Sequence, residues 1–219
     1  MYLTRLLLDA RSARVRRDLG SPYEMHRTLV RAFVQDENQT PPRFLWRLEP
    51  QMLWNSPPVV LVQSEHEADW RNADSFSGYF KAAPETRPLP LDRLCPEAAD
   101  GAPWPRLRFR LFANPTVSHS ASERKRGRRT GVVGADAQLA WLERQGQRCG
   151  FVLEAAVVTG SDVLHFRKSR EDTAPISLQR VCYEGVLRAT DAARLKAAVS
   201  AGIGPGKAFG CGLLSLARI

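Results

Sequence analysis

Residues 106–115 have the sequence RLRFRLFANP, in which basic and apolar side chains alternate. Successive side chains of a β-strand point to opposite faces, so the alternation separates the two kinds of residue. One face would carry the apolar residues Leu107, Phe109 and Leu111. The other would carry Arg106, Arg108 and Arg110. The pattern predicts a strand with one buried face and one basic face.

Upstream of this strand the chain contains short apolar runs and one strongly marked helix. The apolar runs predict strands at residues 2–8, 43–49 and 57–64. We expect a helix over 21–35, a weaker helix over 67–80 and a Pro- and Ala-rich loop over 81–105. With strand 106–115 the order becomes βαββαβ, the ferredoxin-like motif. Residues 1–116 are therefore expected to form one domain.

Downstream the same order recurs less regularly. Strands are expected at 128–134, 151–158, 178–190 and 211–218, and helices at 135–149 and 191–203. A polar, hairpin-like stretch, residues 162–172, separates the two middle strands. Residues 117–219 are therefore expected to form a second domain. The predicted fold is α+β, with two tandem ferredoxin-like (RRM-like) domains.

The composition indicates a globular protein with a polyanionic partner. The chain is 43% hydrophobic and 25% charged, which is ordinary for a protein with a core. Its 32 Lys and Arg residues exceed the 23 acidic ones, giving a net charge of +9. Nucleic acid is the first partner that such a surplus suggests, an anionic membrane is the second, and solubility alone is the third explanation.

Neither the cysteines nor the N-terminus suggests a metal, a disulfide or a membrane. Cys95, Cys149, Cys182 and Cys211 form no C-x-x-C pair and have no neighbouring His in metal-ligand spacing. We expect reduced, mostly buried thiols, no metal and no cofactor. Residues 6–8 are the only consecutive leucines near the start, too few for a signal peptide or membrane span. A cytoplasmic protein without membrane attachment is expected.

The helix expected over 21–35 carries the residues best suited to catalysis. Ser21, Pro22 and Glu24 form a helix-start signal with a capping box. On a helical projection, one face collects the apolar residues Met25, Leu29, Ala32 and Phe33. The opposite, exposed face collects Tyr23, His26, Arg27, Val30 and Arg31.

Such a polar face can cleave RNA without a metal, because RNA carries its own nucleophile, the 2′-hydroxyl. A histidine can transfer the proton near neutral pH, and an arginine can hold phosphate oxygens. A tyrosine can hydrogen-bond the sugar or stack on a base. The alternative is that His26 is simply solvated. His66, His119 and His165 have no comparable neighbours in the sequence.

Three basic stretches hold most of the positive surplus: ARSARVRRD (10–18), ERKRGRRTG (123–131) and HFRKSR (165–170). They are either solvated loops or a surface that follows the phosphates of a folded RNA stem. The predicted RNA-binding residues are Arg11, Arg14, Arg16, Arg17, Arg27, Lys125, Arg126, Arg128, Arg129, Arg167, Lys168, Arg170 and Lys207.

The segment GIGPGKAFG (202–210) contains Gly202, Gly204, Gly206 and Gly210 but is not a Walker A motif. Residue 201 is Ala where the motif needs its first Gly, and Ala208 stands where it needs Ser or Thr. A helix precedes the segment and a strand follows it, the reverse of a P-loop. Two interpretations remain, a close-packing turn or a loop that approaches a backbone phosphate.

The chain resembles the CasE family, the CRISPR repeat endoribonucleases of type I-E systems. Four segments carry the resemblance: MYLTRLLL, DLGSPYEMHRTL, RLRFRLFANP, and VCYEGVL with GIGPGKAFGCGLLSLA. The resemblance implies two ferredoxin-like domains and metal-independent cleavage at the base of the repeat hairpin in precursor CRISPR RNA. The implied products carry a 5′-hydroxyl and a 2′,3′-cyclic phosphate, and the enzyme stays on its product as a subunit of Cascade.

The resemblance also assigns residues. The family's catalytic histidine and tyrosine fall on His26 and Tyr23, and its glycine-rich loop on Gly202 to Gly210. Some members have lysine where this chain has Arg31, and arginine keeps the charge without readily giving up a proton. Two other function classes remain open, a non-catalytic subunit that binds hairpin RNA and an adaptor for an acidic protein or a membrane surface.

Overall fold

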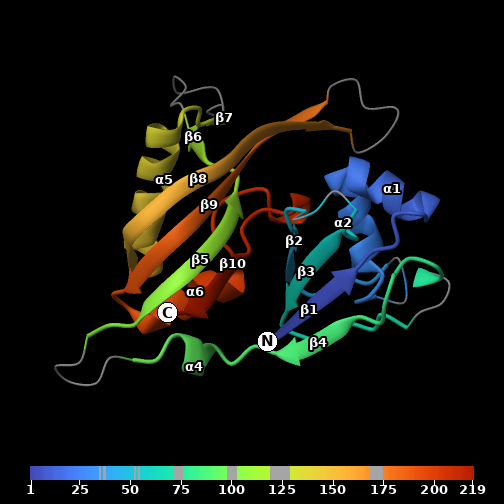
Figure 1. Ribbon diagram of the computed structural model, residues 1–219, viewed down its shortest axis with the longest axis horizontal. Coiled ribbons are helices and arrows are strands. Elements are labelled where there is room, and N and C mark those ends of the chain that lie inside the picture. Colours follow the sequence, from blue (N-terminus) through green and yellow to red (C-terminus); the bar gives the residue numbers. More distant parts are fainter. Residues whose placement is uncertain are drawn as a thin grey trace. The chain divides into compact units, whose positions relative to one another are not determined.

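The computed structural model describes residues 1–34, 36, 38–51, 53, 55–71, 76–97, 103–118, 129–167 and 175–219 (Figure 1). The chain forms two compact units. The first unit comprises Met1–Pro90, Phe166–Pro175 and Lys207–Gly210. The second unit comprises Leu91–His165, Ile176–Gly206 and Cys211–Ile219. Both units take in segments from distant parts of the sequence.

The first unit is built on a four-stranded antiparallel sheet in the order β2-β3-β1-β4. Its strands are β1 (Tyr2–Leu7), β2 (Phe44–Leu48), β3 (Val59–Ser64) and β4 (Glu85–Pro88). The helices α1 (Ala13–Gly20) and α2 (Pro22–Val30) follow β1 in the chain. Buried side chains of both helices and of β1, β2 and β3 form one core cluster, so the helices cover one face of the sheet.

The second unit contains another four-stranded antiparallel sheet, in the order β10-β5-β9-β8. Its strands are β5 (Arg106–Ala113), β8 (Phe151–Phe166), β9 (Ile176–Ala189) and β10 (Leu214–Arg218). The helices are α4 (Leu91–Leu94), α5 (Ala135–Cys149) and α6 (Ala192–Ala201), and η1 (Lys207–Phe209) is a single 3₁₀ turn that belongs to the first unit. A separate ribbon pairs β6 (Thr116–Ser118) with β7 (Arg129–Gly131).

The strand predicted over 106–115 is confirmed as β5, and its apolar face is buried as expected. It was expected to be the last strand of the first βαββαβ unit, but it pairs with β9 and β10 in the second sheet. The fourth strand of the first sheet is β4, which pairs with β1. Strand β4 lies within residues 81–105, the segment expected to be a loop. The first segment of the first unit ends at Pro90, whereas residues 1–116 were expected to form the first domain.

Several other elements differ in extent from the predictions. The strand expected over 128–134 forms β7 in the small ribbon rather than part of the main sheet. Strand β8 continues to Phe166, so it includes the start of the stretch expected to be a polar hairpin. The helix expected over 67–80 falls partly on residues 72–75, outside the described residues, and Glu67 to Arg71 are not helical.

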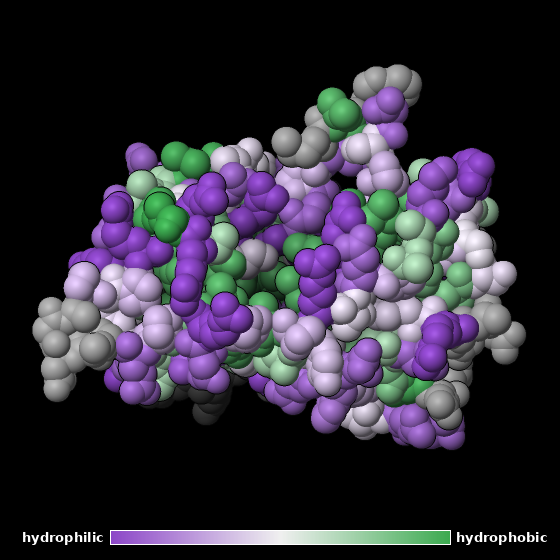
Figure 2. All heavy atoms as spheres, turned by 60° about the horizontal axis from the view of Figure 1, so that its bottom comes forward, coloured by the Kyte–Doolittle hydropathy of each residue, from purple (hydrophilic) through white to green (hydrophobic). Residues whose placement is uncertain are grey.

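The face of the molecule drawn in Figure 2 is mainly hydrophilic. Purple side chains cover most of the face drawn in Figure 2, with smaller apolar areas among them. In the described ranges, five large apolar side chains are more than half exposed: Leu53, Val133, Val157, Val163 and Ile219. Such isolated exposure is normal for a globular protein.

Candidate functional site

Helix α2 begins as the capping signal predicts. The Ser21 hydroxyl accepts a hydrogen bond from the backbone N–H of Glu24, at 3.4 Å, and Pro22 is the first helical residue. The helix ends at Val30 with Arg31 as its C-cap, earlier than the expected residue 35. The Glu24 carboxylate contacts Arg17 and Arg27, so it links α2 to α1.

His26 lies against an aromatic ring rather than on a fully solvated face. Its imidazole stacks on the Phe44 ring of β2, with centroids 5.1 Å apart and planes inclined by 20°. Its Nδ1 atom is buried and has no hydrogen-bond partner in the described part of the chain. The expectation of an exposed histidine is therefore wrong. Burial lowers the pKa of His26 below its ordinary value of 6.5, because the protonated ring would place a charge in a poorly solvated site.

Tyr23 and Arg27 lie together on α2, one turn apart. The Arg27 guanidinium carbon is 5.8 Å from the centroid of the Tyr23 ring, within the range of a cation–π contact. The Arg27 Nη1 atom also lies 3.4 Å from Glu24 Oε1. The phenol and the guanidinium are therefore held on the polar side of the helix that carries His26.

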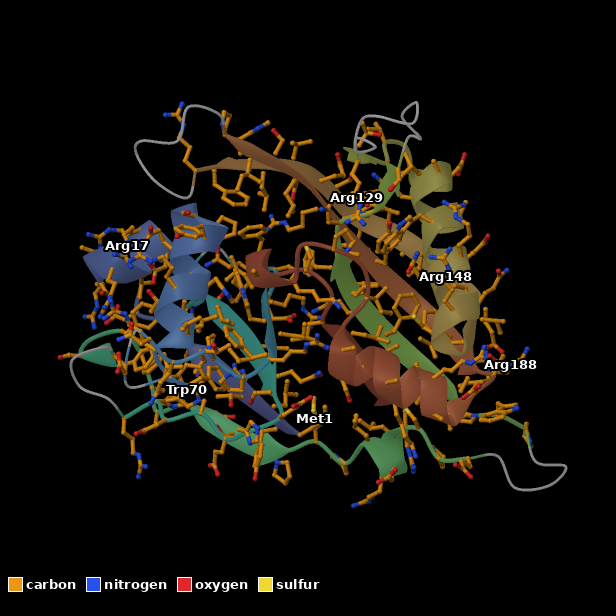
Figure 3. All side chains as sticks on the ribbon, turned by 180° about the vertical axis from the view of Figure 1, so that it is seen from behind. Met1, Arg17, Trp70, Arg129, Arg148 and Arg188 are labelled. Atoms are coloured by element: carbon orange, nitrogen blue, oxygen red, sulfur yellow. The ribbon has the colours of Figure 1, made fainter. Side chains whose placement is uncertain are left out.

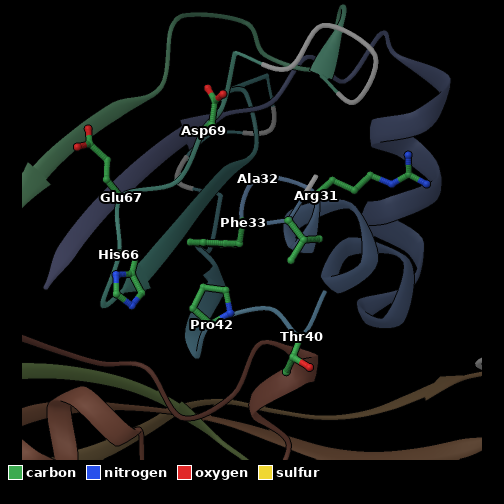
Figure 4. A pocket seen from close by; sticks show the side chains of 9 residues that line it. Arg31, Ala32, Phe33, Thr40, Pro42, His66, Glu67 and Asp69 are labelled. Atoms are coloured by element: carbon green, nitrogen blue, oxygen red, sulfur yellow. The ribbon is translucent and has the colours of Figure 1, made fainter. Parts of the chain in front are cut away.

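Arg31 is exposed at the end of α2 and contributes to a surface pocket of about 760 Å³. Figure 4 shows its side chain extending away from Phe33 and His66, which line the same pocket. Two carboxylates, Glu67 and Asp69, also line it. His66, which the sequence placed in a polar loop without relevant neighbours, therefore lies in the same pocket as Arg31.

A buried ionic network fixes α1 against α2. Arg17 donates to Asp18 Oδ1, at 2.9 and 2.7 Å, and to the Thr28 hydroxyl, at 3.3 Å. The Tyr79 hydroxyl donates to Asp18 Oδ2, at 2.7 Å. Asp18 is only 1% exposed, and burial raises the pKa of Tyr79 well above its usual range, with the Asp18 charge adding to the shift. Asp18 and Tyr79 were not predicted, since neither stands out in the sequence.

The predicted RNA-binding arginines around α1 are partly held by the protein itself. Arg17, labelled in Figure 3, has a half-exposed side chain but belongs to the network above. Arg11 pairs with Asp9 and, by hydrogen bonding, lowers the pKa of that carboxyl to about 2. Arg16 donates to the carbonyl groups of Ala10 and Arg11. Arg14 is half-buried. Helix α1 and the residues just before it thus concentrate positive charge, and three of these arginines are held by contacts within the protein.

The other predicted basic residues are described only in part. Lys125, Arg126, Arg128, Lys168 and Arg170 lie outside the described residues. Arg129 is exposed on β7, and Arg167 is exposed directly after β8. Of the arginine stripe on β5, Arg106 pairs with Glu154 and Arg110 with Glu184. Glu154 and Glu184 therefore offset part of the positive charge of that stripe.

The glycine-rich segment is a closely packed turn. Gly202, Gly204, Gly206 and Gly210 all have positive φ. A Cβ on Gly204 would lie 3.0 Å from the Trp141 ring, and a Cβ on Gly210 would lie 3.0 Å from the Trp46 ring. Lys207 stands at the start of η1, which packs against α2 and β2. These contacts agree with the first of the two interpretations, a close-packing turn.

No described helix is long and apolar enough to span a membrane. No three His, Cys, Asp or Glu side chains in the described part of the chain gather as they would to hold a metal ion.

Comparisons with known proteins place the chain in a family. Residues 1–218 match the family model described as CRISPR associated protein. The chain is 38% identical to the CRISPR-associated endoribonuclease Cse3 of Thermus thermophilus, over 99% of this chain and all of that protein. It is 33% identical to the Cascade subunit CasE of Escherichia coli, over 52% of this chain and 58% of that protein. The chain belongs to the CasE/Cse3 family of CRISPR-associated proteins.

A solved structure supports the same relationship. The structure of Thermus thermophilus Cse3 bound to an RNA representing a pre-cleavage complex has a TM-score of 0.81 to this chain at 37% identity. The match covers 99% of this chain and 98% of that one.

Proposed function

We propose that this chain is a metal-independent endoribonuclease that cleaves precursor CRISPR RNA at the base of the repeat hairpin. The observation that carries the proposal is the half-buried His26 on a helix that also presents Tyr23 and Arg27. The similarity to Cse3 and CasE supports it. We further propose that the chain stays on the processed RNA as a subunit of Cascade in the cytoplasm.

The proposed reaction uses the 2′-hydroxyl of the RNA as nucleophile. His26 accepts the proton of that hydroxyl while its oxygen attacks the adjacent phosphorus. The bond from phosphorus to the 5′ oxygen breaks, and that oxygen takes up a proton. The products are a 2′,3′-cyclic phosphate and a 5′-hydroxyl. A lowered pKa keeps His26 in the neutral, proton-accepting form at neutral pH.

The neighbouring residues act on charge and orientation in this proposal. Arg31 stabilises the negative charge that grows on the phosphorane, as a cation that does not transfer protons. Tyr23 orients the sugar or a base beside the cleaved bond. The network of Arg17, Asp18 and Tyr79 holds α2 in place, which keeps the imidazole oriented.

The finer fold belongs to the same proposal. The order β2-β3-β1-β4 and the order β10-β5-β9-β8 both follow the 4-1-3-2 arrangement of a βαββαβ unit. We infer two ferredoxin-like domains, the first with the catalytic helix and the second with the start of the glycine-rich segment, residues 202–206. The predicted basic residues, Arg129 and Arg167 among them, contact RNA phosphates in this account.

The test is single-turnover cleavage of a labelled repeat hairpin in the presence of EDTA. The His26→Ala variant should cleave about 10²–10⁴-fold more slowly, the range that general acid–base groups contribute, with nearly unchanged RNA affinity. The control is Asp92→Asn, a change in α4 at a residue that pairs with Lys196, and it should cleave at the wild-type rate. Wild-type protein that binds the hairpin without cutting it would instead indicate a non-catalytic RNA-binding subunit.

A further inference from the structure

The 3₁₀ turn η1 (Lys207–Phe209) is tied to the first unit by specific contacts. The Trp46 Nε1 atom of β2 donates a hydrogen bond to the Ala208 carbonyl, at 3.3 Å. Gly210, which follows the turn, has φ +81°, and a Cβ there would lie 3.0–3.3 Å from three atoms of the Trp46 six-membered ring. The turn also packs against α2. A segment near the end of the chain is thus held by a tryptophan near its beginning.

Trp46 shares a strand face with the ring that supports His26. Phe44 and Trp46 are two residues apart on β2, so their side chains point to the same side of the sheet. Both are buried in the core cluster beneath the helices, at 8% and 4% exposure. The Phe44 ring stacks on the His26 imidazole, and the Trp46 indole hydrogen-bonds to η1. A displacement of the indole would therefore disturb both the turn and the surface on which the imidazole rests.

The same turn also contacts Phe166, which belongs to the first unit. The Phe209 ring lies 4.7 Å from the Phe166 ring, measured between centroids, at an inclination of 58°. Phe166 is the last residue of β8 and is 6% exposed. Arg167, the next residue, is exposed. The turn therefore contacts the residue directly before Arg167, one of the predicted RNA-binding residues.

We propose that η1 is a positioning element that fixes the helix of His26 and Phe166, the last residue of β8, in one geometry. Trp46 and Phe209 are its positioning residues, and neither is proposed to touch the reacting atoms. The proposal rests on the proposed function, because its consequence is measured on RNA cleavage. It predicts that loosening η1 lowers the cleavage rate more than it lowers RNA affinity.

The first test compares Trp46→Phe with Trp70→Phe. Trp46→Phe keeps an aromatic ring but removes the N–H donor to Ala208. The single-turnover rate should fall about tenfold, which corresponds to one hydrogen bond of about 1.4 kcal/mol, while the Kd changes by less than about twofold. Hydrogen exchange of residues 207–211 should accelerate. Trp70 Nε1 is buried without a hydrogen-bond partner in the described chain, so Trp70→Phe should leave the loop exchange unchanged.

The second test places a methyl group between residue 210 and the Trp46 ring. Gly210→Ala should slow cleavage because its Cβ meets the indole. Gly78→Ala and Gly134→Ala are matched controls, since both glycines have positive φ but open space around the added Cβ. They should cleave at nearly the wild-type rate. In the Trp46→Phe background the smaller ring leaves room, so Gly210→Ala should cost less there than in the wild type.

Three outcomes overturn the proposal. The first is that Trp46→Phe cleaves at the wild-type rate although hydrogen exchange of residues 207–211 is accelerated. The second is a loss of affinity that matches the loss of rate, which would make η1 a binding element only. The third is strict additivity of the two substitutions. Failure of the proposed function is separate, since His26→Ala would then cleave normally or the wild type would not cleave.

Discussion

The imidazole of His26 stacks on the phenyl ring of Phe44, with ring centroids 5.1 Å apart. The contact places the imidazole partly out of water and lowers its pKa. It is also a contact between α2 and β2, so the histidine's environment is set by the core and not only by its own helix. The charged or titratable groups on these packed elements include Tyr23, Glu24 and Arg27 on α2, Arg47 on β2 and Lys207 on η1.

Replacing Phe44 should shift the pH dependence of cleavage. Phe44→Leu gives the imidazole more access to water, so its pKa should rise toward the ordinary value of 6.5. Since the neutral form is proposed to act as the base, the acid limb of the pH–rate profile should move to higher pH. The measurement is the single-turnover rate between pH 4 and pH 8. Phe151→Leu, a buried change in the second unit, is the control, and an identical shift there would contradict the account.

Removing the Tyr79 hydroxyl should destabilise the first unit. Tyr79→Phe deletes a 2.7 Å hydrogen bond to the buried Asp18 carboxylate, and hydrogen bonds to charged groups contribute about 1.5–3 kcal/mol. We expect the free energy of unfolding in urea to fall by about 2 kcal/mol. Tyr183→Phe is the matched control, because that hydroxyl donates to the neutral Gln138 carbonyl and should cost about 1 kcal/mol. Equal losses for the two variants would argue against a charged network.

Arg167→Ala should weaken RNA binding through lost phosphate contact. The plot of log affinity against log salt should become shallower by about one, the value expected for one phosphate contact. Arg188→Ala is the control, because Arg188 is paired with Glu154 on the sheet. An unchanged salt slope for Arg167→Ala would remove this residue from the proposed interface.

The cysteines should differ in reactivity toward a thiol reagent at pH 8. Burial raises the pKa of Cys211 to about 12, and Cys95 is also buried with a raised pKa. Cys149 is only partly buried. Cys149 should therefore be modified first in the native protein, and Cys211 only after unfolding, as followed by mass spectrometry. Rapid native modification of Cys211 would contradict the burial described above.

The sequence predicted most elements but not how they are grouped into sheets. Alternation in residues 106–115 correctly predicted a strand, yet alternation does not determine which strand will pair with it. The competing strand β4 has the sequence ETRP and is largely exposed, so it carries no apolar pattern that could reveal it. A short edge strand of this kind is set by pairing with β1 rather than by its own side chains.

The sequence predicted which residues belong to the candidate site, but it did not predict which side chains pack around them. The capping signal and the helical projection located His26, but placed it on a solvated face because Phe44 is distant in the sequence. The packing of Gly210 on Trp46 was also hidden, since 164 positions separate them and only the fold brings them together. Local patterns predict which face a residue occupies, while long-range contacts determine what covers that face.

The most direct test of the central claim is cleavage of a repeat hairpin that carries one 2′-deoxy substitution, at the nucleotide before the cleaved bond. If His26 takes a proton from that 2′-hydroxyl, the wild-type protein should bind the substituted hairpin with nearly normal affinity and leave it uncut. His26→Ala should likewise bind the unmodified hairpin and cleave it about 10²–10⁴-fold more slowly than the wild type. Cleavage of the deoxy hairpin at the normal rate, or full activity of His26→Ala, would contradict the account.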